Sequence, residues 1–314
     1  MKIAFIGKFK KIYDEEGKAL SLEKIGHQVI RFEEDTFNRG FQGGWNNNLK
    51  ALLSYEPDVV MFTKLRVPNS LEVIRTLRVH NIPTVSWYPD YSFDWNEGLG
   101  RLGSDLLMIP DGTNQMKWKI LGVNQHCVRQ GIYDEMCYSG KDIPDLNKDI
   151  LFVGSLNDHL YKHRIPLIDF LEETYGDRFL HLGGKNSDEI RNHELNDIIK
   201  SVKITIGDSL YAPYYWSNRI YETIGRGGFI LHSYVEGIDE EYEVGKHFDV
   251  YKTYGKNGWG RKIDFDDLKS KIDLYLNDEK LRNTVRRLGM SHTIQHHTLL
   301  NRSEQVMEII EREL

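Results

Sequence analysis

Three polar residues with helical spacing, Asn218, Arg219 and Glu222, precede the glycine-rich run that starts at Gly225. The spacing predicts that all three lie on the first turns of a helix that leads into a strand. A helix N-terminus with an arginine suits a phosphate, because its free N–H groups, its dipole and the guanidinium act together. A carboxylate one turn later suits the two hydroxyls of a ribose, since it accepts from two donors. This segment therefore predicts a nucleotide site.

A second candidate group for the same site follows the apolar run at residues 149–153. Gly154 and Ser155 come at the end of this run, and Lys162 and Arg164 flank the start of the next predicted helix. Positive charge at a helix start is electrostatically unfavourable, so an anion is expected to lie there. We interpret Lys162 and Arg164 as phosphate ligands, with a solvated basic surface as the alternative.

The first half of the chain carries candidate residues in two loops. Gly7, Lys8 and Lys10 follow the first apolar run, and Asp90 and Asp94 lie in an aromatic loop after a later one. The first loop lacks the glycine patterns of dinucleotide enzymes and P-loops, so we interpret it as an acceptor or phosphate loop. Asp90, at a strand end, is the candidate general base, and Asp94 is a candidate sugar contact. Turn capping by both aspartates and a solvated lysine loop are the alternatives.

Two patterns look like metal sites but predict none. His292 and His296 have the spacing of two zinc ligands on a helix, yet no third ligand accompanies them at a known spacing. Asp264 and Asp266 come directly before an amphipathic helix, where aspartate is a common N-cap. We therefore expect no metal ion and no cofactor.

The elements that position these residues follow from alternating apolar runs and helical patterns, which are typical of parallel strands joined by right-handed crossovers. In such sheets ligands bind outside the carboxyl ends of the strands, where most of the candidate residues lie. Strands are expected at residues 2–6, 27–32, 58–62, 84–88, 105–109 and 126–129, and again at 149–154, 179–182, 202–206, 229–232 and 247–251; helices dominate from 265 onward.

The domain organisation follows from length and composition. A chain of 314 residues exceeds the usual limit of a single core, so two domains are expected. A loop-rich segment at residues 133–148 interrupts the alternation and is interpreted as the linker. We expect an α/β protein with two facing Rossmann-like domains and a cleft between them. The N-terminal domain would span residues 1–140 and the C-terminal domain 141–314, with a final helix at about 297–314 packing back on the first.

The charge and the cysteine content exclude several classes. The formal net charge of −6 argues against a general polyanion binder. Two cysteines cannot form a disulfide framework. The first apolar run is too short for a secretory signal, and no stretch approaches the roughly 18 apolar residues that span a bilayer. We therefore expect a cytoplasmic protein.

From Gly154 onward, the chain resembles nucleotide-sugar glycosyltransferases of the GT-B architecture, and among them the group-1, CgeB-like, spore-maturation type. The resemblance rests on Ser217–Glu222, Gly225–Leu231, an acidic loop through Gly237 and the closing segment His296–Arg302. It implies a donor nucleotide, such as a UDP-sugar, in this half.

The resemblance also implies individual roles. Glu222 would bind the ribose, and Arg219, with Lys162 or Arg164, would face the diphosphate. Many group-1 transferases carry a second glutamate eight residues earlier, but Tyr214 stands there. The donor sugar and the choice between retaining and inverting chemistry therefore remain open. Metal-independent chemistry is expected, since protein cations can stabilise the departing diphosphate.

The sequence thus predicts a glycosyltransferase that moves a hexosyl or pentosyl group from a nucleoside-diphosphate sugar to an acceptor hydroxyl. A nucleotide-sugar epimerase on the same fold and a non-catalytic nucleotide-sugar-binding protein are the alternatives. In the simplest alternative, Glu222 and Arg219 only pair with each other. The acceptor is left open among a small molecule, an envelope glycan and a modified DNA base, and so is the oligomeric state.

Overall fold

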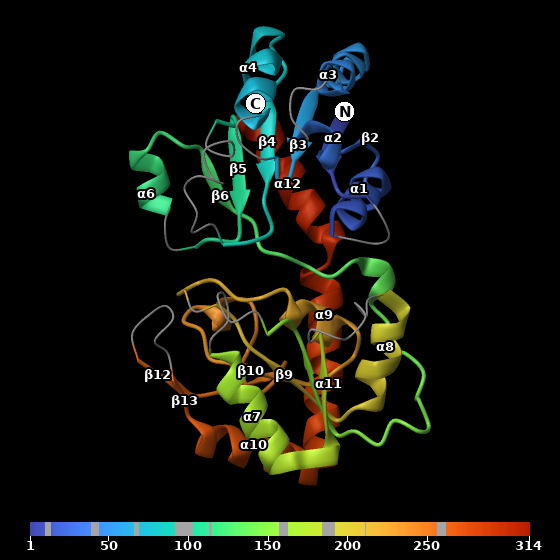
Figure 1. Ribbon diagram of the computed structural model, residues 1–314, viewed down its shortest axis with the longest axis vertical. Helices are drawn as coiled ribbons and strands as arrows, with labels where there is room; N and C mark the ends of the chain where they lie inside the picture. Colours follow the sequence, from blue (N-terminus) through green and yellow to red (C-terminus); the bar gives the residue numbers. More distant parts are fainter. Residues whose placement is uncertain are drawn as a thin grey trace. The chain divides into compact units, whose positions relative to one another are not determined.

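The computed structural model of the protein describes residues 1–9, 14–38, 44–65, 69–91, 103–112, 115–156, 163–183, 192–210, 212–255 and 262–314. The chain divides into two compact units, Met1–Tyr133 with Leu299–Leu314, and Asp134–Thr298 (Figure 1). The predicted residues Lys10, Asp94 and Lys162 lie outside the described residues. Within the described residues, no helix has the length and apolar character needed to cross a membrane.

The first unit is built on a parallel sheet, six-stranded in the described residues, in the order β2-β1-β3-β4-β5-β6. Its central strands β3, β4 and β5 are fully buried, as a sheet covered on both faces requires, and β3 and β5 are continuous apolar runs. The elements are β1 (Lys2–Gly7), α1 (Asp14–Lys24), β2 (Gln28–Glu33), α2 (Glu34–Asn38), α3 (Gly44–Ser54), β3 (Val59–Phe62), α4 (Asn69–Val79), β4 (Thr84–Trp87), β5 (Leu106–Ile109), α6 (Gln115–Ile120), β6 (Gln125–Cys127) and α12 (Leu299–Glu313).

Helices cover both faces of this sheet because successive strand residues point to opposite sides. Ile3 and Phe5 of β1 pack with residues of α1 and α12 on one face. Ala4 and Ile6 of the same strand pack with residues of α2, α3 and α4 on the other. The helix at the end of the sequence, α12, therefore completes the core of the first unit.

The second unit has a parallel sheet, five-stranded in the described residues, in the order β11-β10-β9-β7-β8. Its elements are η1 (Asp134–Met136), β7 (Ile150–Val153), α7 (Arg164–Tyr175), η2 (Gly176–Arg178), β8 (Phe179–Leu182), α8 (Asn192–Ser201), β9 (Ile204–Gly207), α9 (Arg219–Gly225), β10 (Ile230–Ser233), η3 (Ile238–Glu240), β11 (Asp249–Tyr251), β12 (Thr253–Tyr254), β13 (Lys262–Ile263), α10 (Phe265–Asn277) and α11 (Glu279–His296).

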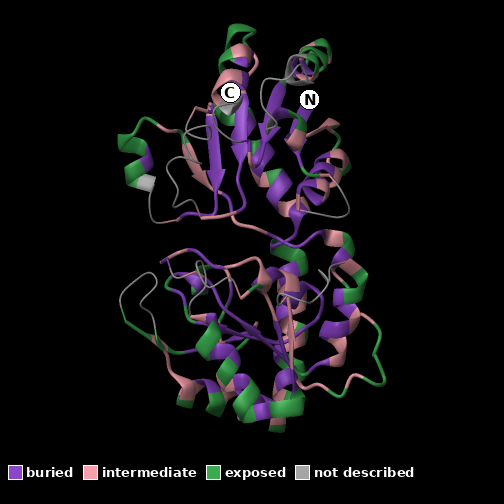
Figure 2. Ribbon diagram, in the orientation of Figure 1, coloured by how far each residue is buried: buried purple, intermediate pink, exposed green. Residues whose placement is uncertain are grey.

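The strands of the second unit are also buried between helices, as Figure 2 shows. Ile150 and Phe152 of β7 pack with α7 and α10 on one face. Leu151, between them in sequence, packs with α8 on the other face. The predicted class, α/β with two Rossmann-like parallel sheets, is confirmed.

The first unit ends at Tyr133, before the expected boundary at residue 140. The residues after Tyr133 attach to α8 of the second unit, because the Asn196 side-chain amide donates to the carbonyls of Met136 (3.0 Å) and Tyr138 (2.8 Å). α7 begins at Arg164 as predicted and β8 has the predicted bounds, whereas β6 ends at Cys127 instead of residue 129. The helix α3 and the antiparallel pair β12–β13 were not predicted from the sequence.

The strand order creates a switch point in each sheet. The chain moves from β7 to β8 on one side and then to β9 on the other side of β7. The first unit repeats this order with β1, β2 and β3. The loops that follow the first and third strands diverge at such a point and leave room for a ligand.

Candidate functional site

The candidate site of the second unit lies at its switch point, where β7 and β9 run side by side. β7 is followed by Gly154 and Ser155, two of the predicted residues, and β9 is followed by Asp208. Because parallel neighbours end at the same edge, these residues lie close together. Asp208 was not predicted from the sequence.

Asp208 is a buried carboxylate that binds three basic side chains. Its Oδ2 accepts from Arg164 Nε (2.7 Å) and from His163 Nε2 (2.7 Å), and its Oδ1 accepts from Arg219 Nη1 (2.6 Å). Burial alone would raise the pKa of Asp208, but the guanidinium groups of Arg219 and Arg164 hold that pKa well below its ordinary value. Asp208 therefore stays ionised and acts as the internal counter-ion of both arginines.

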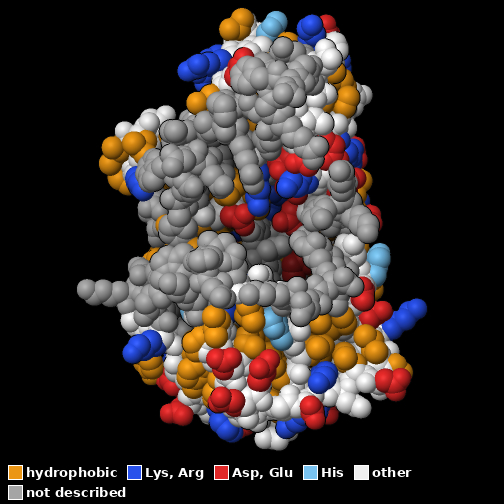
Figure 3. Space-filling model, viewed as in Figure 1, with side chains coloured by type: hydrophobic (Ala, Val, Ile, Leu, Met, Phe, Trp, Pro, Cys, Tyr) orange, Lys and Arg blue, Asp and Glu red, His pale blue; other side chains and the backbone are white. Residues whose placement is uncertain are grey.

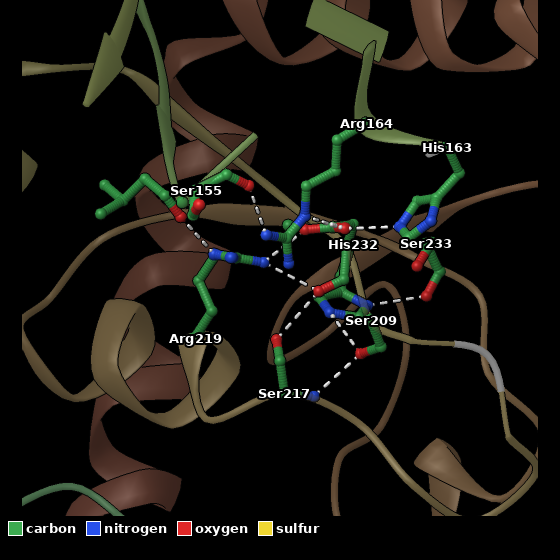
Figure 4. Close-up of polar contacts among 12 residues, drawn as sticks. Ser155, His163, Arg164, Ser209, Ser217, Arg219, His232 and Ser233 are labelled. Carbon is green, nitrogen blue, oxygen red and sulfur yellow. Dashed lines mark hydrogen bonds and ion pairs between the residues drawn. The ribbon is translucent and has the colours of Figure 1, made fainter. Parts of the chain in front are cut away.

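The same arginines hold the ends of the strands, as Figure 4 shows. Arg219 Nε donates to the carbonyl of Val153 (2.7 Å), and Arg164 Nη1 donates to that of Ser155 (2.8 Å). Gly154 lies between these two carbonyls, and a Cβ there would come within 2.8 Å of Arg219 Nη2. A residue without a side chain is therefore required for the arginine to reach the strand.

The charges of this group do not cancel. Arg164 and Arg219 contribute two positive charges against the single negative charge of Asp208, and all three side chains are largely buried. Asp208 also explains how Arg164 can be the first residue of α7, since an internal carboxylate offsets the unfavourable charge at the helix start. The remaining positive charge makes the switch point favourable for an anion.

A serine and histidine network fixes the segment between β9 and α9. Ser209 Oγ donates to His232 Nε2 (3.2 Å) and accepts from the N–H of Ser217 (2.8 Å), while Ser217 Oγ donates to the carbonyl of Asp208 (2.9 Å). His232 Nδ1 donates to the carbonyl of Ser233 (2.7 Å). Burial lowers the pKa of His232 to about 4, so the ring is neutral at neutral pH.

Glu222 lies on α9, which begins at Arg219, with Asn218 at the N-cap. Its Oε2 accepts from Nη2 (2.6 Å) and Nε (3.1 Å) of Arg226, and its Oε1 accepts a longer hydrogen bond from Asn218 Nδ2 (3.3 Å). Arg226 is itself held by the side chain of Asn196. Pairing between Glu222 and Arg219, the simplest alternative from the sequence, is therefore wrong. Glu222 is an oriented carboxylate with Oε1 only weakly engaged.

Tyr214 occupies the position where a second glutamate is expected. Its φ of 57° lies in the left-handed region, which is unusual for an aromatic residue. The ring lies against Gly237, where an added Cβ would be 2.3 Å from a ring atom, and the Tyr214 N–H donates to the carbonyl of Glu236 (2.7 Å). Strained backbone of this kind concentrates at ligand sites, so Tyr214 joins the candidate residues.

Those predicted residues of the first unit that the structure describes, Gly7, Lys8 and Asp90, lie at the carboxyl edge of its sheet. Gly7 ends β1, and a Cβ there would come within 2.9 Å of Glu15 Cγ. Lys8 Nζ lies 3.5 Å from a carboxylate oxygen of Glu34. Asp90 follows β4, and its Oδ2 is 3.0 Å from Lys64 Nζ. The basic loop thus has an acidic neighbour that was not predicted from the sequence.

The metal-like patterns have structural partners. In the parts of the chain that the structure describes, no group of three or more His, Cys, Asp or Glu side chains could hold a metal ion. His292 Nε2 donates to the carbonyl of Glu241 (2.7 Å). The Asp264 side chain accepts from the N–H of Asp267 (3.1 Å), so the predicted N-cap is confirmed.

Comparison with known proteins connects this site to a family. Residues 162–308, which include Arg164, Asp208, Arg219 and Glu222, match a family model described as glycosyl transferase-like. No curated protein gives a significant match to the sequence.

Solved structures match over almost the whole chain. Anabaena HepE in complex with UDP and glucose has a TM-score of 0.68 at 13% identity, covering 99% of this chain and 100% of its own. A glycosyltransferase from Rickettsia africae has a TM-score of 0.64 at 11% identity, covering 99% and 98%. UDP-GlcNAc 2-epimerase from Neisseria meningitidis, bound to UDP-GlcNAc, has a TM-score of 0.58 at 9% identity, covering 99% and 100%.

At these identities the structural matches establish the fold alone. The two parallel-sheet units have the GT-B fold of these structures. This fold agrees with the match of residues 162–308, which contain the Asp208 site, to the model described as glycosyl transferase-like.

Proposed function

We propose that the protein transfers a hexosyl or pentosyl group from a nucleoside-diphosphate sugar to an acceptor hydroxyl. The observation that carries this proposal is the buried, net-positive group of Arg164, Arg219 and Asp208 at the switch point of the second unit. A diphosphate is the part of such a donor that a buried positive charge stabilises. The family match over the same residues supports the reaction class.

The contacts suggest how each residue serves the donor. Nε and Nη1 of Arg164 and Arg219 already donate within the chain. Their net positive charge would therefore act on the diphosphate mainly as a field, while Lys162, two residues before the start of α7 in the sequence, would contact it. Glu222 would accept from the ribose hydroxyls through Oε1, because Arg226 already holds Oε2.

UDP-sugars are the first donors to test, since the matched Anabaena structure holds UDP and glucose. We propose that the reaction needs no metal ion, because the arginines can stabilise the departing diphosphate. If the reaction inverts the anomeric centre, Asp90 would be the base; if it retains the configuration, Asp90 would orient the substrate. The CgeB-like subfamily is the finer assignment that we propose.

A thermal-shift series with UDP-, GDP-, TDP-, ADP- and CMP-sugars tests this function. A true donor raises the melting temperature in proportion to the logarithm of its concentration above Kd. The shift should survive EDTA and disappear in Glu222→Ala, while Glu240→Ala, an exposed glutamate of the same unit, should keep it. If none of the nucleotides shifts the wild-type protein, the proposal is wrong.

An epimerase is the second candidate, because an epimerase shares the fold. It would alter the donor sugar without an acceptor. Analysis of the sugar after incubation with donor alone separates the two reactions. Tight donor binding with no turnover across many acceptors would instead favour a non-catalytic binding protein.

A further inference from the structure

The carboxyl edge of the first unit's sheet carries a second group of charged residues, which we call the edge array: Glu15, Lys18, Glu34, Lys64 and Asp90. Figure 3 shows acidic and basic side chains gathered where the strands of this unit end. Lys64 follows β3, Asp90 follows β4, and Glu34 follows β2 directly. The array therefore surrounds the switch point between β1 and β3, the place in the first unit that corresponds to the Asp208 site.

Lys18 is a buried ammonium with too few partners. The residue is 4% exposed, and its Nζ makes one hydrogen bond in the described structure, a long one of 3.5 Å to the carbonyl of Trp87. Nζ also lies 4.6 Å from the centre of the Trp87 ring. Burial lowers the pKa of Lys18, although Asp14, Glu15 and Asp90 oppose this effect. An ammonium has three N–H donors, so Lys18 can still donate to an acceptor oxygen.

Glu34 is a buried carboxylate that lacks, among the described residues, a hydrogen-bond donor for one of its oxygens. The residue is 3% exposed, and its Oε2 is buried without a hydrogen-bond partner in the described structure. Its Oε1 lies 3.5 Å from Lys8 Nζ. Burial raises the pKa of Glu34, against the influence of Lys8 and Lys64. A buried carboxylate oxygen without a donor costs free energy, and a ligand hydroxyl would remove this cost.

The other three residues of the edge array, Lys64, Asp90 and Glu15, have partners of their own. Lys64 Nζ and Asp90 Oδ2 are 3.0 Å apart, and Glu15 Oε1 accepts from Thr63 Oγ1 at 3.0 Å. Asp90 raises the pKa of Lys64 against the effect of burial, and Glu15 acts in the same direction. Groups of both signs thus lie along the edge, so neither an anion nor a cation meets a field of one sign.

We propose that the edge array binds an uncharged, hydroxyl-rich compound, a sugar that receives the transferred glycosyl group. This inference rests on the proposed transferase function. A sugar carries no charge, and its hydroxyls can both accept from Lys18 and donate to Glu34. A phosphate or carboxylate would satisfy Lys18 but would face Glu34 and Asp90, and a cation would meet the converse problem.

Acceptor kinetics with a charge-matched series test the proposal. With a donor identified by thermal shift, nucleoside-diphosphate release is measured against glucose, glucuronate and glucose 6-phosphate, and against neutral pentoses, hexoses and disaccharides. We expect a neutral sugar to accelerate release, and its charged counterpart to be poorer by about tenfold or more in kcat/KM. A preference for the charged sugars, or acceleration by oligonucleotides and by none of the neutral sugars, would overturn the proposal.

Three variants test the residues. Lys18→Met and Glu34→Gln should each raise the acceptor KM by about 10- to 100-fold, as expected for the loss of a hydrogen bond to a charged group. Donor binding should be unchanged, and Lys18→Met should melt no lower than wild type because it removes a desolvated charge. Lys50→Met, at an exposed lysine of the same unit, should behave as wild type. An unchanged acceptor KM in both array variants refutes this inference even when the donor binds, whereas absence of donor binding refutes the proposed function.

Discussion

Replacing Asp208 by asparagine tests the central interaction of the second unit. The substitution keeps the shape of the side chain but leaves Arg164 and Arg219 buried side by side without their counter-ion. Breaking a buried ion pair by removing one partner costs about 3–5 kcal/mol, and the loss of two charge-assisted hydrogen bonds gives a similar figure. We therefore expect Asp208→Asn to lower the free energy of unfolding of the second unit by about 3–5 kcal/mol.

Hydrogen exchange followed by mass spectrometry measures this effect in each unit separately. In peptides from β7 and β9, the free energy of the opening through which the amides exchange should fall by this amount. Peptides from β1 and β3 serve as the internal reference. Asp239→Asn, at an exposed aspartate of the same unit, is the matched control and should leave both sets unchanged. A loss below about 1 kcal/mol in the β7 and β9 peptides would refute the assignment of Asp208 as the essential counter-ion.

Three further predictions address other parts of the chain. His232 has a pKa of about 4 in the folded protein, below its ordinary 6.5, so the unfolded chain binds the extra proton first as pH falls. Between pH 6.5 and 4 the free energy of unfolding of the wild type should therefore fall by about 3 kcal/mol relative to that of His232→Gln. Urea titrations that give the same pH dependence for the two proteins would contradict this. Gly289→Ala should lower the melting temperature, because the added Cβ would lie 2.1 Å from the carbonyl oxygen of His247. This clash costs about 1–3 kcal/mol, which exceeds the gain from the higher helix propensity of alanine. A higher melting temperature would show that the two segments move apart readily. Asp90→Asn should keep donor binding in the thermal-shift assay and reduce turnover by about 100-fold or more, and a loss of binding equal to that of Glu222→Ala would contradict their separate roles.

The sheets were predictable because the sequence signal for a buried parallel strand is local. Ile150–Val153 is a continuous apolar run, Phe179–Leu182 is apolar apart from His181, and the helix between them begins at the predicted Arg164. Strand order is a property of the whole sheet, so it is not contained in any one run. The strand β6 was predicted to end two residues too late because Val128 is buried beyond the last ladder position.

The candidate site was predictable only in part. Arg164 at a helix start correctly indicated a nearby anion, but the structure supplies that anion from within the chain as Asp208, 44 residues later. The pairing of Glu222 with Arg226 had a local signal, the i,i+4 spacing, which is a better geometry than the i,i−3 spacing to Arg219. Lys18 and Glu34 had none, because their burial depends on strands distant in sequence.

The packing of α12 determines the order in which the chain can fold. Met307 and Ile310 close the face of the first sheet that Ile3 and Phe5 form, yet they are synthesised after the whole of the second unit. The first unit therefore emerges from the ribosome with an apolar face that α1 covers only in part. Translation delays within residues 134–298 should prolong this exposure, which makes the nascent first unit the part most prone to aggregation and most dependent on chaperones.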